Sequence, residues 1–164
     1  MTKPGAGDPA GSLRRAVERA LPALRALSEE ESARPRAPGK WSPREILGHL
    51  IDSASNNHQR FVRAQFQKDL VFPGYEQDAW VRAQAYASAP WKELLDLWRS
   101  YNLQLARVMD AVPRDVLRRA TRRHNFHKIG FREVADGEPA TLEWLTQDYV
   151  VHLEHHLKQI AAKP

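Results

Sequence analysis

The sequence predicts an all-α protein built as a small antiparallel helical bundle. Apolar residues recur every three to four positions in four long segments, a clear helix-start signal opens the second of them, and no segment shows a convincing β-strand pattern. The 164 residues suffice for one domain with a real core but are too few for two comfortable ones. The expected architecture is therefore a bundle of four helices.

The first predicted helix begins at Ser12 as its capping residue. Its apolar stripe comprises Leu13, Val17, Leu21, Leu24 and Leu27. Residues 1–11 precede it as a predicted flexible leader, which leaves 12–164 as a single domain. Because Pro22 has no amide N–H and its ring crowds the preceding turn, we expect a kink or a break near Ala20.

The clearest helix start is Ser42-Pro43-Arg44-Glu45. It combines a hydroxyl at the N-cap, proline in the first helical position and glutamate in the third, which together form a capping box. This second helix is expected to run to about Lys68. Residues 69–90 then predict a long connection with one helical turn around 78–82, and a connection of this length usually has a function or crosses the bundle.

Two further long helices are expected in the second half of the chain. One runs from Trp91 to Ala111, and the last runs from near Pro139 or Thr141 to about Ala162. Between them, residues 113–119 predict a short helical turn and 121–138 an irregular segment.

Composition excludes several classes of function. The chain has no run of 18 apolar residues, so no membrane span is expected, and Met1–Ala10 lacks the apolar core of a secretory signal. The net charge of +5 is spread along the chain without an aromatic-basic motif, so a nucleic-acid partner is not expected. The absence of cysteine excludes disulfides and thiolate ligands and fits a cytoplasmic protein.

Three of the seven histidines lie close together in the last helix, at 152, 155 and 156. His152 and His156 are four residues apart, so they lie one turn apart on one helix face and can bind one metal ion together. At about 100° per residue, both fall on an edge of the apolar stripe, whereas His155 falls toward solvent. The pair is therefore the stronger ligand candidate. His124 and His127, in the irregular segment, predict a surface role.

A third ligand has to come from another helix. In the second helix, His49, Ser53, Asn56 and Arg60 form a polar stripe along one edge of the core face. Such a stripe suits a site between two helices of a bundle. A single half-buried histidine is more often structural than a ligand, so the residues alone leave a metal site and a structural role about equally supported.

Two segments resemble a known family. The segment Trp41–Asp52 (WSPREILGHLID) resembles the capped second helix of the DinB/YfiT-like superfamily, and Asp148–Ile160 (DYVVHLEHHLKQI) resembles its last helix with the signature His-x-x-His-His-x-x-Gln-Ile. The resemblance covers roughly residues 12–162. Leu157-Lys158 stands where the family usually has Arg-Gly, which places the chain nearer the branch that ends in His-Leu-x-Gln-Ile.

The resemblance implies a four-helix bundle with up-down-down-up topology and a divalent metal held by His49, His152 and His156. It also implies a homodimer acting on a small-molecule substrate. Wider relatives transfer low-molecular-weight thiols, and many members without an assigned activity are named as metal-dependent hydrolases. Zinc is the metal most expected, with nickel or another transition metal as the alternative, because three imidazoles select weakly among such ions.

These inferences predict a metal-dependent enzyme that activates a thiol or water at an open coordination position. Asn56 and Arg60 are then expected to orient or pair with an anionic substrate, and Asp148 to accept a hydrogen bond from a ligand histidine. All three residues are explained equally well as solvated groups at the bundle edge. The alternative functions are a metal-binding stress-response bundle without turnover and a DNA-associated stress protein.

Overall fold

The structure, a computed structural model, describes residues 7–161 and contains four long helices. These are α1 (Pro9–Ala26), α3 (Pro43–Arg63), α5 (Trp91–Ala111) and α8 (Leu142–Ala161). Short helices occupy the connections: α2 (Glu29–Ala33), α4 (Gln77–Ala83), the 3-10 helix η1 (Tyr86–Ser88), α6 (Arg114–Arg118) and α7 (Phe126–Ile129). Within residues 7–161 no strand forms, and only two isolated bridges occur. The predicted all-α bundle is confirmed.

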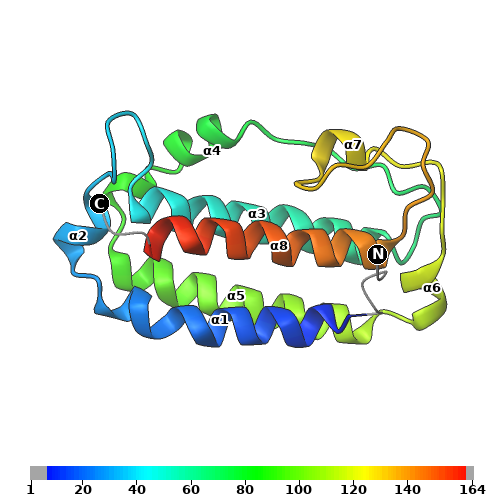
Figure 1. The fold of residues 1–164 in the computed structure, drawn as a ribbon, viewed down its shortest axis with the longest axis horizontal. Helices are drawn as coiled ribbons and strands as arrows, with labels where there is room; N and C mark the ends of the chain where they lie inside the picture. The colour runs from blue at the N-terminus through cyan, green and yellow to red at the C-terminus, as the bar shows by residue number, and fades with distance from the viewer. Residues whose placement is uncertain (1–6, 162–164) are drawn as a thin grey trace, which may run out of the picture.

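The topology is up-down-down-up. In Figure 1, α1 and α8 run in one direction along the bundle, and α3 and α5 run in the other. The connection over residues 64–90 returns along the length of the molecule, so α5 starts at the same end as α3. Each of α1 and α3 packs against both α5 and α8. The long crossing therefore makes α3 and α5 parallel, and it places α3 antiparallel beside α8.

The start of α1 differs from the prediction. Asp8, rather than Ser12, is the N-cap residue, and its carboxylate accepts a hydrogen bond from the amide of Gly11 at 2.8 Å. Pro9 takes the first turn, where its missing N–H costs nothing. The helix thus includes three residues that were assigned to the leader, while residues 1–6 of that leader lie outside the described part of the chain.

The helix α1 also continues through Pro22 to Ala26, so the chain has no break near Ala20. Pro22 lies on the exposed side of the helix. Water can there satisfy the carbonyl that loses its helical partner. The second long helix was also expected to run to about Lys68, but α3 ends five residues earlier, at Arg63.

Buried apolar side chains from all four long helices form one core. The largest fully buried members include Leu13, Leu47, Leu50, Trp98, Leu105, Leu145 and Leu153. The predicted capping box at the start of α3 is present, with Ser42 and Glu45 each bonded to the other's backbone amide. No helix in residues 7–161 is long and apolar enough to cross a membrane.

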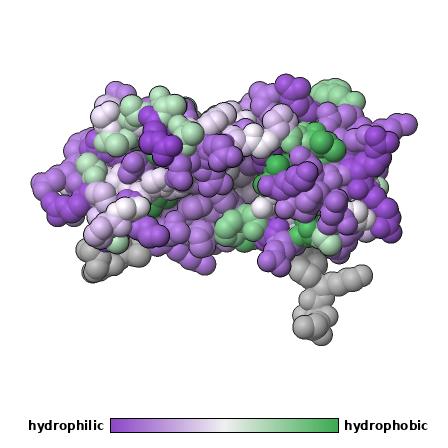
Figure 2. Space-filling model, turned by 90° about the horizontal axis from the view of Figure 1, so that it is seen from above, coloured by the Kyte–Doolittle hydropathy of each residue, from purple (hydrophilic) through white to green (hydrophobic). Residues whose placement is uncertain are grey.

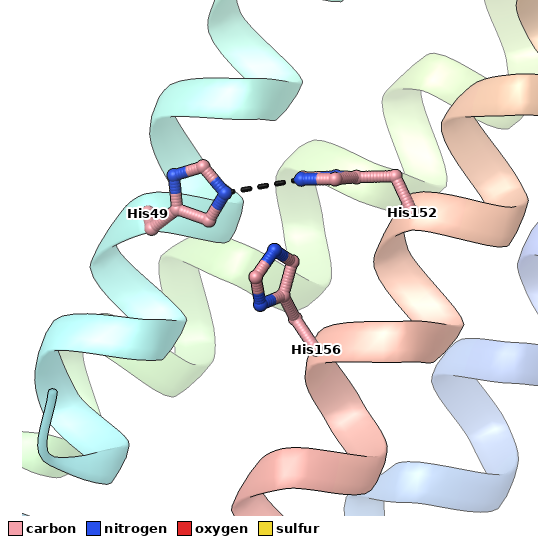
Figure 3. A group of neighbouring side chains, drawn as sticks. All are labelled: His49, His152 and His156. Carbon is pink, nitrogen blue, oxygen red and sulfur yellow. Dashed lines mark hydrogen bonds between the residues drawn. The ribbon is translucent and has the colours of Figure 1, made fainter. Parts of the chain in front are cut away.

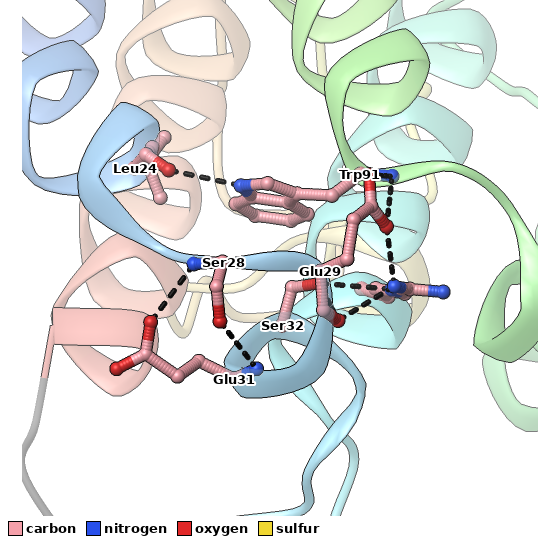
Figure 4. A network of polar contacts seen from close by, with 7 residues as sticks. Leu24, Ser28, Glu29, Glu31, Ser32 and Trp91 are labelled. Carbon is pink, nitrogen blue, oxygen red and sulfur yellow. Dashed lines mark hydrogen bonds and ion pairs between the residues drawn. The ribbon is translucent and has the colours of Figure 1, made fainter.

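A polar network joins α2, α3 and α5 at one end of the bundle (Figure 4). The buried Arg44 donates through Nε to Ser32 Oγ at 2.9 Å and through its terminal nitrogen to the carbonyl and carboxylate of Glu29. The same carboxylate accepts from the amide of Trp91, whose indole N–H donates to Leu24 O at 2.9 Å. One arginine thereby fixes the short helix α2 to the start of α3.

Replacing Arg44 with alanine is expected to lower the free energy of unfolding by about 1–2 kcal/mol, because the bonds to Ser32 and Glu29 are lost together. Urea denaturation of the variant measures this change. Arg34→Ala is the matched control, since Arg34 and its partner Glu30 are both highly exposed. Its effect should stay below about 0.5 kcal/mol, and equal losses in the two variants would contradict the role assigned to Arg44.

Candidate metal centre

Three histidines from two helices converge on one point (Figure 3). His49 comes from α3, and His152 and His156 come from α8. One nitrogen of each ring lies within 4.8 Å of the others, and the Nε2 atoms of His49 and His152 are 3.0 Å apart. The three residues chosen from the sequence are therefore the three that the fold brings together.

The geometry of α8 separates these ligand candidates from His155. His152 and His156 are partly buried and face α3, while His155 is exposed. The Nε2 atom of His155 accepts a hydrogen bond from the side-chain amide of Gln159 at 3.1 Å. The prediction from helical phase that His155 lies on the solvent side is confirmed.

The second nitrogen of each ring differs in its surroundings. In His156, Nδ1–H donates to Gln159 Oε1 at 2.8 Å, which leaves Nε2 with a free lone pair. In His152, Nδ1 lies 3.4 Å from Ser53 Oγ. In His49, which is fully buried, Nδ1 has no hydrogen-bond partner. Two of the three rings thus have a neighbour that sets their orientation.

Burial keeps these rings in the form that binds metal. It lowers the pKa of His49 to about 4 and that of His152 to about 2, and the charges of the neighbouring histidines act in the same direction. The pKa of His156 is also lowered, chiefly by burial. At neutral pH the three imidazoles are therefore uncharged, which is the state required of a ligand.

The donor set fits a divalent transition metal. In a tetrahedral site with bonds of 2.0–2.1 Å, ligand nitrogens lie about 3.3 Å apart, close to the separation between His49 and His152. Three neutral imidazoles supply three ligands and leave one coordination position open. A cation between the rings of His49 and His152 would bind the lone pairs of both Nε2 atoms.

Two of the three histidines, His152 and His156, border a cavity of about 340 Å³ between α3, α8 and the two long connections, and His155 and Asp148 line it as well. Ser53, Asn57 and Arg60 line it from α3, Tyr75 and Gln77 from the first connection, and Ile129, Gly130 and Phe131 from the second. Figure 2 looks down on this side of the molecule, where hydrophilic side chains prevail and hydrophobic ones form separate small groups. The cavity is large enough for a small molecule.

The structure corrects the prediction for Asn56. Its side-chain amide donates to the backbone carbonyl of Asp52 at 2.9 Å, and the residue does not line the histidine cavity. Asn57 lines it instead and is buried. Asn56 lines a neighbouring cavity, together with Pro73. Arg60, the other predicted residue, does line the histidine cavity.

The structure also corrects the prediction for Asp148. This buried carboxylate accepts hydrogen bonds from the amides of Phe131 and Arg132, both at 2.8 Å, and from Arg132 Nε at 3.1 Å. It makes no hydrogen bond to a ligand histidine. Its effect on the site is indirect, because it holds the loop that places the Phe131 ring against His152, with centroids 5.4 Å apart.

Sequence reasoning missed Tyr75 and Phe131. Both lie in connections without helical periodicity, so no pattern related them to the histidines. Burial raises the pKa of Tyr75 to about 12, against the opposing influence of the Arg60 charge. The only available signal was the unusual length of the first connection, which did predict a functional or crossing segment.

The surface role predicted for His124 is wrong, because this side chain is buried. Its Nε2 lies 2.6 Å from the carbonyl of Glu138, and its Nδ1 accepts from the amide of Phe126. It ties the second connection together. His127 is partly exposed and lies 3.5 Å from Asp136.

Residues 12–160 match the sequence model of the DinB superfamily. The chain belongs to the DinB superfamily. A relative from Oceanobacillus iheyensis, provisionally named as a metal-dependent hydrolase, is 23% identical over 137 residues, which cover 84% of this chain and 72% of the relative. YfiT from Bacillus subtilis, described as a probable metal-dependent hydrolase with an unusual four-helix bundle topology, superposes with a TM-score of 0.76 at 20% identity. That comparison covers 98% of this chain and 86% of YfiT, and it shows the shared fold.

Proposed function

We propose that this DinB-superfamily protein binds one divalent metal ion through His49, His152 and His156 and acts as a metal-dependent enzyme on a small molecule. The observation that carries the proposal is the convergence of three neutral imidazoles beside a cavity of about 340 Å³. The names of the two relatives support the same class of reaction. The reaction is either hydrolysis or transfer of a thiol.

A bound zinc ion would supply Lewis acidity, lowering the pKa of a water or thiol that takes the open position. The chain's own residues have three tasks. The histidines would hold the ion without adding charge, Gln159 fixes the ring of His156, and Phe131 packs its ring against His152. The adjoining cavity between α3, α8 and the two connections would hold the substrate.

Metal analysis of the native chain, purified without a histidine tag, is the first test. About one equivalent of zinc, nickel or a similar ion per chain is expected. The metal-loaded and metal-free forms are then compared on a panel of ester and amide substrates and on thiol transfer to electrophiles. Activity that appears only in the metal-loaded form supports the proposal. Turnover of the esters or amides would indicate a hydrolase, and thiol transfer to the electrophiles would indicate a thiol transferase.

The alternative is a metal-binding bundle without turnover. A stoichiometric ion that stabilises the protein, combined with inactivity on both halves of the panel, would favour it. A DNA-associated role would instead require duplex binding that weakens steeply with salt. The homodimer, the cytoplasmic location, the single domain over 12–164 and a thiol cofactor stay predictions from the sequence and the family resemblance.

A further inference from the structure

Arg60 is a buried cation without an anionic partner among the described residues. Its exposed fraction is only 6%, and it takes part in no ion pair within residues 7–161. Its guanidinium donates to Pro73 O at 3.2 Å and to Asn57 Oδ1 at 3.4 Å, both long bonds to neutral groups, and Nε has no partner. Buried charges in proteins are normally paired, so this arginine lacks its expected counterion.

The guanidinium belongs to the same cavity as the histidines. Arg60 lies eleven residues after His49 on α3, which corresponds to about 16 Å along the helix axis. Helical side chains lean toward the N-terminus, so the guanidinium lies nearer the histidines than its Cα does. The contact with Asn57 agrees with this direction. The cavity therefore has His152 and His156 toward one end and a cation toward the other.

Asp148 also lines the cavity and its charge acts on Arg60, but it makes no ion pair with Arg60. Both oxygens of Asp148 are taken by the amides of Phe131 and Arg132, and Arg132 Nε is its ion-pair partner. A divalent ion held by neutral imidazoles would add two further positive charges. With one carboxylate against a guanidinium and a divalent ion, the loaded cavity would carry an excess of positive charge, which favours an anionic occupant.

Tyr75 adds a hydrogen-bond donor to this part of the cavity. Burial raises its pKa to about 12, so the phenol keeps its proton at neutral pH, and its hydroxyl lies near Ser53 and under the influence of the Arg60 charge. A guanidinium fork beside a phenol hydroxyl suits the planar or tetrahedral array of acceptors in a carboxylate or phosphate.

We propose that the substrate of this site is a small molecule with an oxyanion group, a carboxylate or a phosphate, which Arg60 binds while the reacting group lies at the three histidines. This inference rests on the proposed function, because it assigns the reacting end to the metal. Arg60 serves as a binding and orienting residue.

The test is calorimetric titration of inorganic phosphate and, separately, of acetate into the full-length metal-free protein. Arg60→Gln removes the charge, Arg60→Lys keeps the charge without the fork, and Arg99→Gln removes an exposed arginine on α5 as the matched control. We expect at least one anion to bind the wild type, with affinity about tenfold or more weaker in Arg60→Gln, a smaller loss in Arg60→Lys and no change in Arg99→Gln. The tighter anion distinguishes a phosphate from a carboxylate substrate.

Equal anion affinity in the wild type and Arg60→Gln, or no binding of either anion to the wild type, would overturn the inference. Circular dichroism of each variant checks folding, and Arg60→Lys decides the question if Arg60→Gln does not fold. Zinc content separates this inference from the proposed function. Arg60→Gln should keep the zinc stoichiometry of the wild type, whereas a wild type that binds anions through Arg60 but takes up no zinc would refute only the metal-dependent function.

Discussion

Replacing His156 with alanine is expected to remove most of the stabilisation that zinc gives to the wild-type protein. An ion that binds only the folded chain stabilises it by about 4 kcal/mol when its free concentration is a thousandfold above Kd. For a protein of this size, that corresponds to a rise in Tm of roughly 8–16 °C. With two imidazoles left, the ion loses one of its three protein ligands, so both the zinc content and the Tm shift should fall.

His155→Ala is the matched control for this experiment. It removes the neighbouring histidine on the same turn of α8, whose side chain is exposed and is not part of the group of three converging rings. Thermal unfolding with and without zinc should show a wild-type shift in His155→Ala, a much reduced shift in His156→Ala and the same reduction in His49→Ala. An equal reduction in His155→Ala would refute the choice of ligands.

Replacing Gly48 with alanine is expected to lower the free energy of unfolding by as much as about 3 kcal/mol. A Cβ atom at Gly48 would lie 2.2 Å from two atoms of the Tyr86 ring and 2.7 Å from a third. That ring cannot move freely, because its hydroxyl lies within hydrogen-bond distance of two acceptors, Asp52 Oδ1 at 2.8 Å and Gln84 Oε1 at 2.9 Å. Alanine is the better helix former by about 1 kcal/mol, so a net loss would come from the clash.

Gly74→Ala is the control for Gly48→Ala. Its added Cβ would meet only Ile129, at an ordinary contact distance of 3.8 Å, so its stability should change little. Urea denaturation of Gly48→Ala, Tyr86→Leu and the double variant forms a mutant cycle. A coupling energy near zero would show that the close approach of Gly48 and Tyr86 does not limit stability.

Helix formation in this protein depends on local chemistry and was therefore predictable. Ser42 and Glu45 form a capping box because they lie three residues apart at a helix start. The third long helix begins and ends at the predicted residues Trp91 and Ala111. The boundaries that were wrong have equally local causes. Asp8 with Pro9 is a better start than Ser12, and Pro22 is tolerated because it faces solvent.

The choice of His152 and His156 over His155 was also predictable, because the angle between side chains on one helix depends on their spacing alone. The approach of His49 is different, since it requires α3 and α8 to pack side by side in antiparallel directions. Periodicity does not specify which helices are neighbours. The family resemblance supplied that step before the structure did.

The sequence by itself determined the helices, their apolar faces and which histidines on α8 share a face, because these follow from the constant geometry of a helix. Only the tertiary structure decided that Asn57 rather than Asn56 lines the cavity, that Asp148 holds a loop instead of a histidine, and that Tyr75 and Phe131 border the site. The physical reason is that these contacts are made by two long connections, whose paths depend on packing against the finished bundle. The isolation of the Arg60 charge is equally a tertiary property, since it depends on every group that folding brings near it.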